Sequence, residues 1–111
     1  MNFETIEPKK IIFYLGKNWV SIIDLREEEE YKKRHVRTAI NISYDKLMEE
    51  NIESFRNKLL VLYCERGNLS LQAARILSEK GYQVISVYGG FHAINGNYAL
   101  TKEEKSFIME E

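Results

Sequence analysis

The five-residue run LLVLY at residues 59–63 constrains the fold more than any other part of this sequence. It is continuous and apolar, with no polar alternation, which is typical of a central strand in a parallel sheet that is covered on both faces. A short loop follows at residues 64–68. A helix to Lys80 comes next, because apolar residues recur there at helical spacing. A buried strand, a short loop and an amphipathic helix are the unit from which α/β domains are built.

The rest of the chain repeats this alternation. We expect strands at residues 11–15, 19–25, 39–42 and 82–88, and helices at 27–33, 44–50 (capped by Ser43) and 52–57. A terminal helix is expected to open at Thr101, with Phe107 and Ile108 on its apolar side. No Gly/Ser-rich linker interrupts the chain, so residues 1–111 are predicted to form a single domain. The fold class predicted is α/β, with a mostly parallel central sheet flanked by helices on both faces.

Charge and cysteine content narrow the classes of function. The chain has 16 Lys and Arg against 17 Asp and Glu, which argues against a nucleic-acid or anionic-membrane partner. No apolar run of about 18 residues predicts a membrane span, and the first ten residues lack the apolar core of a secretory signal. The single cysteine, Cys64, excludes an internal disulfide, a Cys-x-x-Cys pair and a cysteine-based zinc site. We therefore expect a cytoplasmic domain.

The loop from Cys64 to Ser70 is the candidate site for chemistry. A helix start presents unpaired backbone N–H groups, and Gly67 allows the loop amides to curl into an anion-binding nest. A cysteine facing such a nest has its thiolate favoured over its thiol, which suits covalent chemistry on sulfur or phosphorus oxyanions. The competing interpretation is that Cys64 only fills apolar space, as single cysteines in small cytosolic proteins commonly do.

Several ordered motifs extend this interpretation to nearly the whole chain, from about residue 11 to 94. They are Asp24-Leu25-Arg26, then Glu30-Tyr31, His35-Val36, Ala39 and Asn41-Ile42, then Val61-Leu62-Tyr63-Cys64 with Gly67 and Ser70, and finally Ala73-Ala74, Leu77, Gly81-Tyr82, Val87 and Gly89-Gly90. In this order they resemble the single-domain rhodanese-like family, the thiosulfate sulfurtransferase-like proteins.

The resemblance implies a fold, an activity and a site. Cys64 is the implied nucleophile that takes a sulfane sulfur from thiosulfate or a persulfide donor and passes it to cyanide or a thiol. The implied substrate-binding residues are those of the loop: Glu65, Arg66, Gly67, Asn68, Leu69 and Ser70. A protein sulfur donor or acceptor is a further option for the partner. No cofactor is implied.

The sequence also departs from the family pattern. Leu69 occupies the position at which many members carry an arginine, so we expect weaker thiosulfate binding. Arg34 and Thr38 replace two glycines that flank the family's histidine segment, and Ile94 replaces a common tryptophan.

Two other functions compete with sulfur transfer. A phosphatase or arsenate reductase of the Cys-x5-Arg type would need an arginine where this chain has Ser70. A non-catalytic interaction or sulfur-sensing module would explain the missing arginine, but the retained Cys64 argues against it. Asp24, Arg26 and His35 are predicted to be structural, as an ion pair and a packed histidine, and His92 to be exposed.

Overall fold

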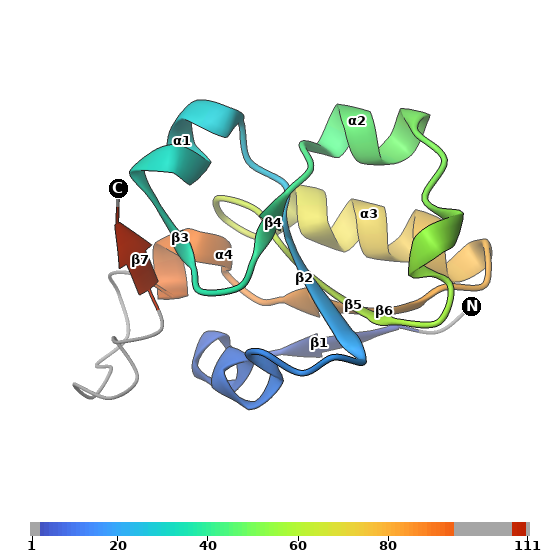
Figure 1. The fold of residues 1–111 in the computed structure, drawn as a ribbon, viewed down its shortest axis with the longest axis horizontal. Helices are drawn as coiled ribbons and strands as arrows, with labels where there is room; N and C mark the ends of the chain where they lie inside the picture. Colours follow the sequence, from blue (N-terminus) through green and yellow to red (C-terminus); the bar gives the residue numbers. More distant parts are fainter. Residues whose placement is uncertain (1–2, 95–107, 111) are drawn as a thin grey trace.

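The computed structural model describes residues 3–94 and, for the backbone only, residues 108–110. Its core is a five-stranded sheet in the order β1-β6-β5-β2-β4, in which every neighbouring pair is parallel (Figure 1). The strands are β1 (Glu4–Ile6), β2 (Val20–Asp24), β4 (Ile40–Asn41), β5 (Leu59–Tyr63) and β6 (Gln83–Val87). The mostly parallel sheet predicted from the sequence is confirmed.

Strand β5 is the central strand, as its apolar run predicts. Val61 lies in register with Ile22 of β2 and with Ile85 of β6. All three are buried, because helices and turns cover both faces of the sheet.

The two faces are covered by different segments. Helices α2 (Tyr44–Glu49) and α3 (Asn68–Glu79), with the short 3₁₀ turn η2 (Glu53–Phe55), cover the face that carries Leu60 and Leu62. The 3₁₀ helix η1 (Pro8–Tyr14) and the short α4 (Gly90–His92) cover the opposite face. Burying one leucine or isoleucine side chain contributes about 2 kcal/mol, so these two apolar layers account for much of the fold's stability.

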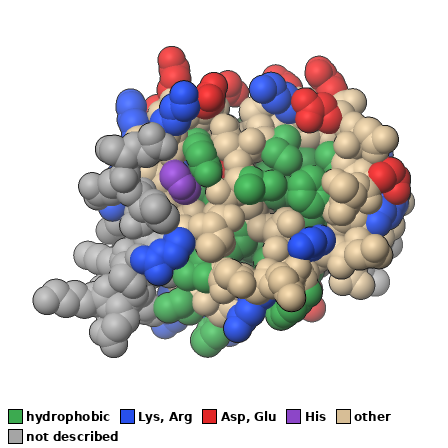
Figure 2. All heavy atoms as spheres, viewed as in Figure 1, with side chains coloured by type: hydrophobic (Ala, Val, Ile, Leu, Met, Phe, Trp, Pro, Cys, Tyr) green, Lys and Arg blue, Asp and Glu red, His purple; other side chains and the backbone are tan. Residues whose placement is uncertain are grey.

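A smaller unit lies beside the sheet. Helix α1 (Glu28–Lys33) leads directly into β3 (Arg34–Val36), which pairs antiparallel with β7 (Ile108–Glu110). Acidic and basic side chains alternate along the edge formed by α1 and α2 (Figure 2), in keeping with the near-zero net charge. No helix in the described part of the chain is both long enough and apolar enough to cross a membrane.

Two local expectations were wrong, and one strand was not predicted. Residues 11–15 form no strand, because Pro8 starts the 3₁₀ helix η1 and only Ile11 of that apolar run is fully buried. The edge strand beside β6 is instead β1, which the sequence pattern did not indicate. Ser43 precedes α2, but its side chain makes no capping hydrogen bond.

The predicted C-terminal helix falls mostly outside the described residues. Ile108, which was predicted to lie on the apolar side of this helix, belongs to strand β7, so the prediction is wrong at that residue. Strand β3 is the antiparallel partner of residues 108–110, and a local helical pattern carries no information about such a distant partner.

Candidate active site

Cys64 directly follows β5, and α3 begins four residues later at Asn68. Because β5 lies between β2 and β6, the loop that carries Cys64 meets the carboxyl ends of both neighbours. Ligands of open parallel sheets bind at this edge. The topology therefore puts the only cysteine at the position where such a fold places chemistry.

The sulfur of Cys64 faces backbone amides at the start of α3. The N–H of Gly67 donates to Sγ at 3.1 Å and that of Ser70 at 3.4 Å. Gly67 makes this geometry accessible, because its φ of 103° is one that residues with a side chain rarely adopt. Two oriented N–H groups and the positive end of a helix favour negative charge on the sulfur.

The sulfur is also enclosed. The Cys64 side chain is only 3% exposed and packs in the apolar layer that holds Leu62 and Ala73. The sequence analysis presented two alternatives for Cys64, a sulfur held by backbone amides and a side chain that fills apolar space. In the structure Cys64 has both properties.

The loop side chains divide into an exposed group and the buried Ser70, whose hydroxyl lies 3.7 Å from the Cys64 sulfur. Glu65, Arg66, Asn68 and Leu69 lie at the surface, and Glu65 Oε1 lies 3.5 Å from Arg26 Nη1. Ser70 is fully buried, and its hydroxyl donates to the Gly67 carbonyl at 3.2 Å. Of the six predicted substrate-binding residues, Gly67 and Ser70 contact the sulfur in this structure.

A buried ion pair supports the loop from β2. The Arg26 guanidinium binds Asp24 with an Nη2–Oδ2 distance of 2.9 Å and lies 4.1 Å from the centre of the Phe91 ring. Burial alone would lower the pKa of Arg26, but the carboxylate of Asp24 outweighs it and holds the pKa above its usual value. Both residues are structural, as predicted.

The two histidines lie outside the sulfur nest. His35 stacks on Tyr31 with ring centres 3.9 Å apart, and its Nδ1 lies 2.8 Å from the Tyr31 carbonyl oxygen. It is packed and hydrogen-bonded, as expected. His92 is half-buried rather than fully exposed, because its backbone N–H is held by the Glu65 carbonyl at 2.9 Å.

Ser86 is the contact that sequence reasoning missed. It lies in β6, is 2% exposed, and its hydroxyl donates to the Ser70 hydroxyl at 2.9 Å. The one available signal was a serine in an otherwise apolar stretch of strand. Its partner could not be inferred, because the β5–β6 register comes from tertiary structure.

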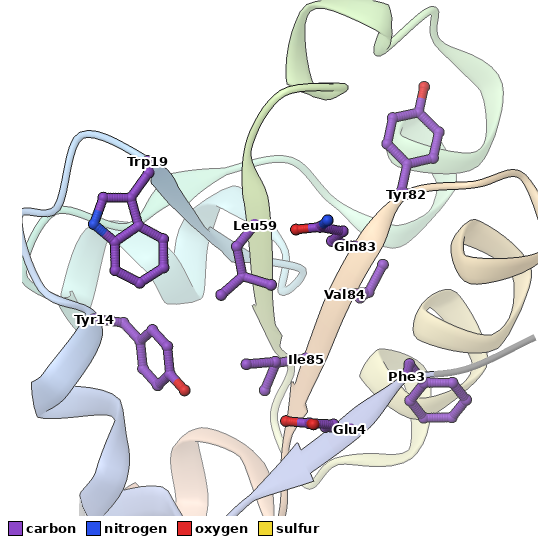
Figure 3. Close-up of a pocket in the computed structure, with 9 residues that line it drawn as sticks. All are labelled: Phe3, Glu4, Tyr14, Trp19, Leu59, Tyr82, Gln83, Val84 and Ile85. Carbon is purple, nitrogen blue, oxygen red and sulfur yellow. The ribbon is translucent and has the colours of Figure 1, made fainter.

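Two hollows lie at opposite ends of the sheet. One, of about 530 Å³, adjoins the loop and is lined by Thr5, Arg66, Gly67, Asn68, Leu71, Ser86, Tyr88 and Gly89. The other, of about 450 Å³, lies at the amino ends of β5 and β6, where Tyr14 and Trp19 face Leu59 and Ile85 (Figure 3). Cys64 does not line the second hollow, whereas the first hollow adjoins the loop that follows it.

Comparison with known proteins agrees with this arrangement. The family model described as "Rhodanese-like domain" matches residues 8–97. The thiosulfate sulfurtransferase GlpE of Coxiella burnetii is 29% identical over 91 residues, which cover 81% of this chain and 85% of that protein. The thiosulfate sulfurtransferase PspE of Escherichia coli is 35% identical over 83 residues, covering 73% and 77%.

A solved structure shows the same fold. The rhodanese-like domain protein from Staphylococcus aureus superposes with a TM-score of 0.73 at 27% identity, covering 89% of this chain and 97% of that one. The matched family model spans most of the chain, and the curated relatives are sulfurtransferases. The chain therefore belongs to the rhodanese-like domain family, as an enzyme of the sulfurtransferase kind.

Proposed function

We propose that this protein transfers a sulfane sulfur from thiosulfate or a persulfide donor to cyanide or a thiol, through a persulfide on Cys64. The observation that carries the proposal is the pair of backbone N–H groups, from Gly67 and Ser70, that donate to Sγ at the start of α3. Such donors stabilise the Cys64 thiolate, both as the attacking group and as the group that leaves when the acceptor takes the sulfur, without any reorganisation of the loop.

The reaction divides into two balanced steps. The Cys64 thiolate attacks the outer sulfur of thiosulfate, an S–S bond forms, and sulfite leaves with the electron pair of the broken bond. Cyanide then attacks the outer sulfur of the persulfide, thiocyanate leaves, and the thiolate is restored. Covalent catalysis of this kind gives ping-pong kinetics.

The exposed part of the loop is the proposed substrate-binding surface. Arg66 is its one cation, while Leu69, 43% exposed, adds no charge. A dianion such as thiosulfate therefore relies on the backbone amides and on Arg66. This composition favours a persulfide donor, on a small molecule or on a protein, as the physiological substrate.

Nucleic acids and membranes are not among the proposed partners. A cytoplasmic location is part of the proposal and rests on the sequence.

A non-catalytic rhodanese-fold module is the second candidate. The observation in its favour is the enclosure of the sulfur, since a side chain that is 3% exposed gives a donor little access. A phosphatase is disfavoured, because the residue six positions after Cys64 is Ser70, whose hydroxyl is bound within the protein.

Intact-mass spectrometry after incubation with thiosulfate tests the proposal. We expect the wild-type protein to gain one sulfur atom, cyanide to remove it as thiocyanate, and Cys64→Ser to show neither reaction. The control is Ser78→Ala, on the far end of α3, which should load sulfur as the wild type does. Absence of an adduct with thiosulfate and with an organic persulfide would favour the non-catalytic module.

A further inference from the structure

Two buried serines form a hydroxyl pair behind the sulfur. Ser70 is fully buried and Ser86 is 2% exposed. Ser86 lies on β6 and faces the same layer as Val84, where its neighbours are otherwise apolar. A buried hydroxyl costs free energy unless it is hydrogen-bonded, and Ser86 meets this requirement by donating to Ser70 at 2.9 Å.

The Ser70 hydroxyl is fully engaged while Cys64 is a thiol. A hydroxyl offers one proton and two lone pairs. Ser70 gives its proton to the Gly67 carbonyl at 3.2 Å and accepts from the hydroxyl of Ser86. Its second lone pair faces the Cys64 thiol, with Sγ and Oγ 3.7 Å apart.

When Cys64 loses its thiol proton, the sulfur no longer donates a hydrogen bond and only accepts them. The Ser70 proton therefore gains a charged acceptor, the thiolate, on that side. The Gly67 carbonyl can release this proton, because it also accepts the backbone N–H of Leu71 at 3.2 Å. A rotation of the Ser70 hydroxyl then adds a third donor to the two amides.

We infer that Ser86 is a positioning residue for sulfur transfer: by donating to Ser70 it holds the Ser70 oxygen in place and frees that hydroxyl's proton for the charged sulfur of Cys64. The inference rests on the proposed function for its role in catalysis. The hydrogen bond from Ser70 to an anionic sulfur can be tested without supplying any sulfur-donating substrate. Ser86 touches no substrate in this scheme and acts through Ser70 alone.

Threonine and valine at position 86 provide the test, because they have the same shape and differ in the hydroxyl. Both variants add the same methyl group beside the hollow that Ser86 lines, so any steric effect is common to them. The readout is the rate at which iodoacetamide alkylates Cys64, measured as a function of pH, since only the thiolate reacts. Thermal melting of each variant reports folding separately.

We expect Ser86→Val to slow alkylation at neutral pH about fivefold and to move the pH profile upward, while Ser86→Thr stays within about twofold of the wild type. In the Ser70→Ala background the two variants should react alike. Ser78→Ala, which removes a hydroxyl bonded within α3, is the control for a generic serine loss.

Two results would overturn the inference. Equal rates for Ser86→Thr and Ser86→Val would show that the hydroxyl does not matter. A difference that persists in the Ser70→Ala background would show that Ser86 does not act through Ser70. The proposed function fails separately, if the wild type takes up no sulfur while these alkylation rates still differ.

Discussion

The backbone N–H of Phe91 donates to the carbonyl oxygen of Cys64 at 2.7 Å, which fastens the start of α4 to the loop that bears the sulfur. The two residues lie far apart in the sequence and meet because β6 lies next to β5. Gly90, directly before Phe91, makes this approach sterically feasible. A Cβ atom there would lie 2.5 Å from the Cys64 carbonyl oxygen and 2.6 Å from that of Glu65.

Gly90→Ala is therefore expected to displace the loop. Gly90 has a φ of 67°, and the added methyl group meets backbone atoms that cannot move independently. We expect a loss of about 3 kcal/mol in the free energy of unfolding, together with loss of sulfur loading. Gly16→Ala is the matched control, because Gly16 has a φ of 69° but a Cβ added there would meet no atom within 4 Å. Chemical denaturation of both variants checks this; equal losses would contradict the steric argument.

Leu69→Arg tests the missing loop cation. The side chain at position 69 is exposed beside the sulfur nest, so an arginine there can add charge without a burial cost. We expect KM for thiosulfate to fall about fivefold, with a gain that shrinks as salt is added. Leu69→Gln supplies similar length without charge and should change KM little. If the glutamine variant gains as much, the effect is not electrostatic.

Tyr63 predicts how stability depends on alkaline pH. Burial, and then the nearby carboxylate of Asp24, raise the pKa of Tyr63 far above its usual value. In the unfolded chain a tyrosine loses its proton at about pH 10, so the stabilising contribution is complete below that pH. Above it, the unfolded state binds fewer protons, and stability falls by up to about 1.4 kcal/mol per pH unit.

The variant Tyr63→Phe removes this contribution. The dependence of the unfolding free energy on pH above about pH 10 should become shallower. Stability at neutral pH should drop by about 1–2 kcal/mol, because the Val36 N–H loses the hydroxyl to which it donates at 3.0 Å. Tyr88→Phe, at a residue that is 62% exposed, is the control and should keep the wild-type slope. Urea titrations at a series of pH values measure both effects. An unchanged slope in Tyr63→Phe would refute the assignment.

Thr38→Gly is expected to stabilise the protein. Thr38 is the only non-glycine residue in the described part of the chain with a positive φ, at 72°. A β-branched side chain is strained in that conformation by about 1–2 kcal/mol, and glycine would relieve this strain. Part of the relief is offset, because glycine makes the unfolded chain more flexible. We expect a net gain of about 1 kcal/mol in thermal or urea unfolding. Thr5→Gly, in strand β1, should instead destabilise; a loss in Thr38→Gly as well would show that no strain is relieved.

The departures from the family pattern have unequal structural consequences. Thr38 stands where the family pattern has a glycine. The structure has a left-handed conformation at that position, with a φ of 72°, so the threonine is strained there. Ile94, in the place of a common tryptophan, is fully buried and fills the layer below β5 and β6.

The sequence alone was sufficient for the α/β class, the central position of residues 59–63 and the loop-then-helix placement of Cys64. These predictions follow from local patterns. An uninterrupted apolar strand is buried on both sides only inside a covered sheet, and the glycine-containing turn after it indicates the start of a helix. The ordered motifs added the family. The error at residues 11–15 has the same origin, since a short apolar run fits a strand or a buried helical turn equally well.

Only the tertiary structure decided which side chains surround the sulfur. Ser86 reaches Ser70, and Gly90 reaches the Cys64 carbonyl, because the parallel pairing of β6 with β5 sets one register among several. It also decided that the sulfur is both held by amides and enclosed by apolar neighbours. Local sequence specifies the element on which a residue lies, whereas the packing of elements distant in the chain specifies what that residue touches.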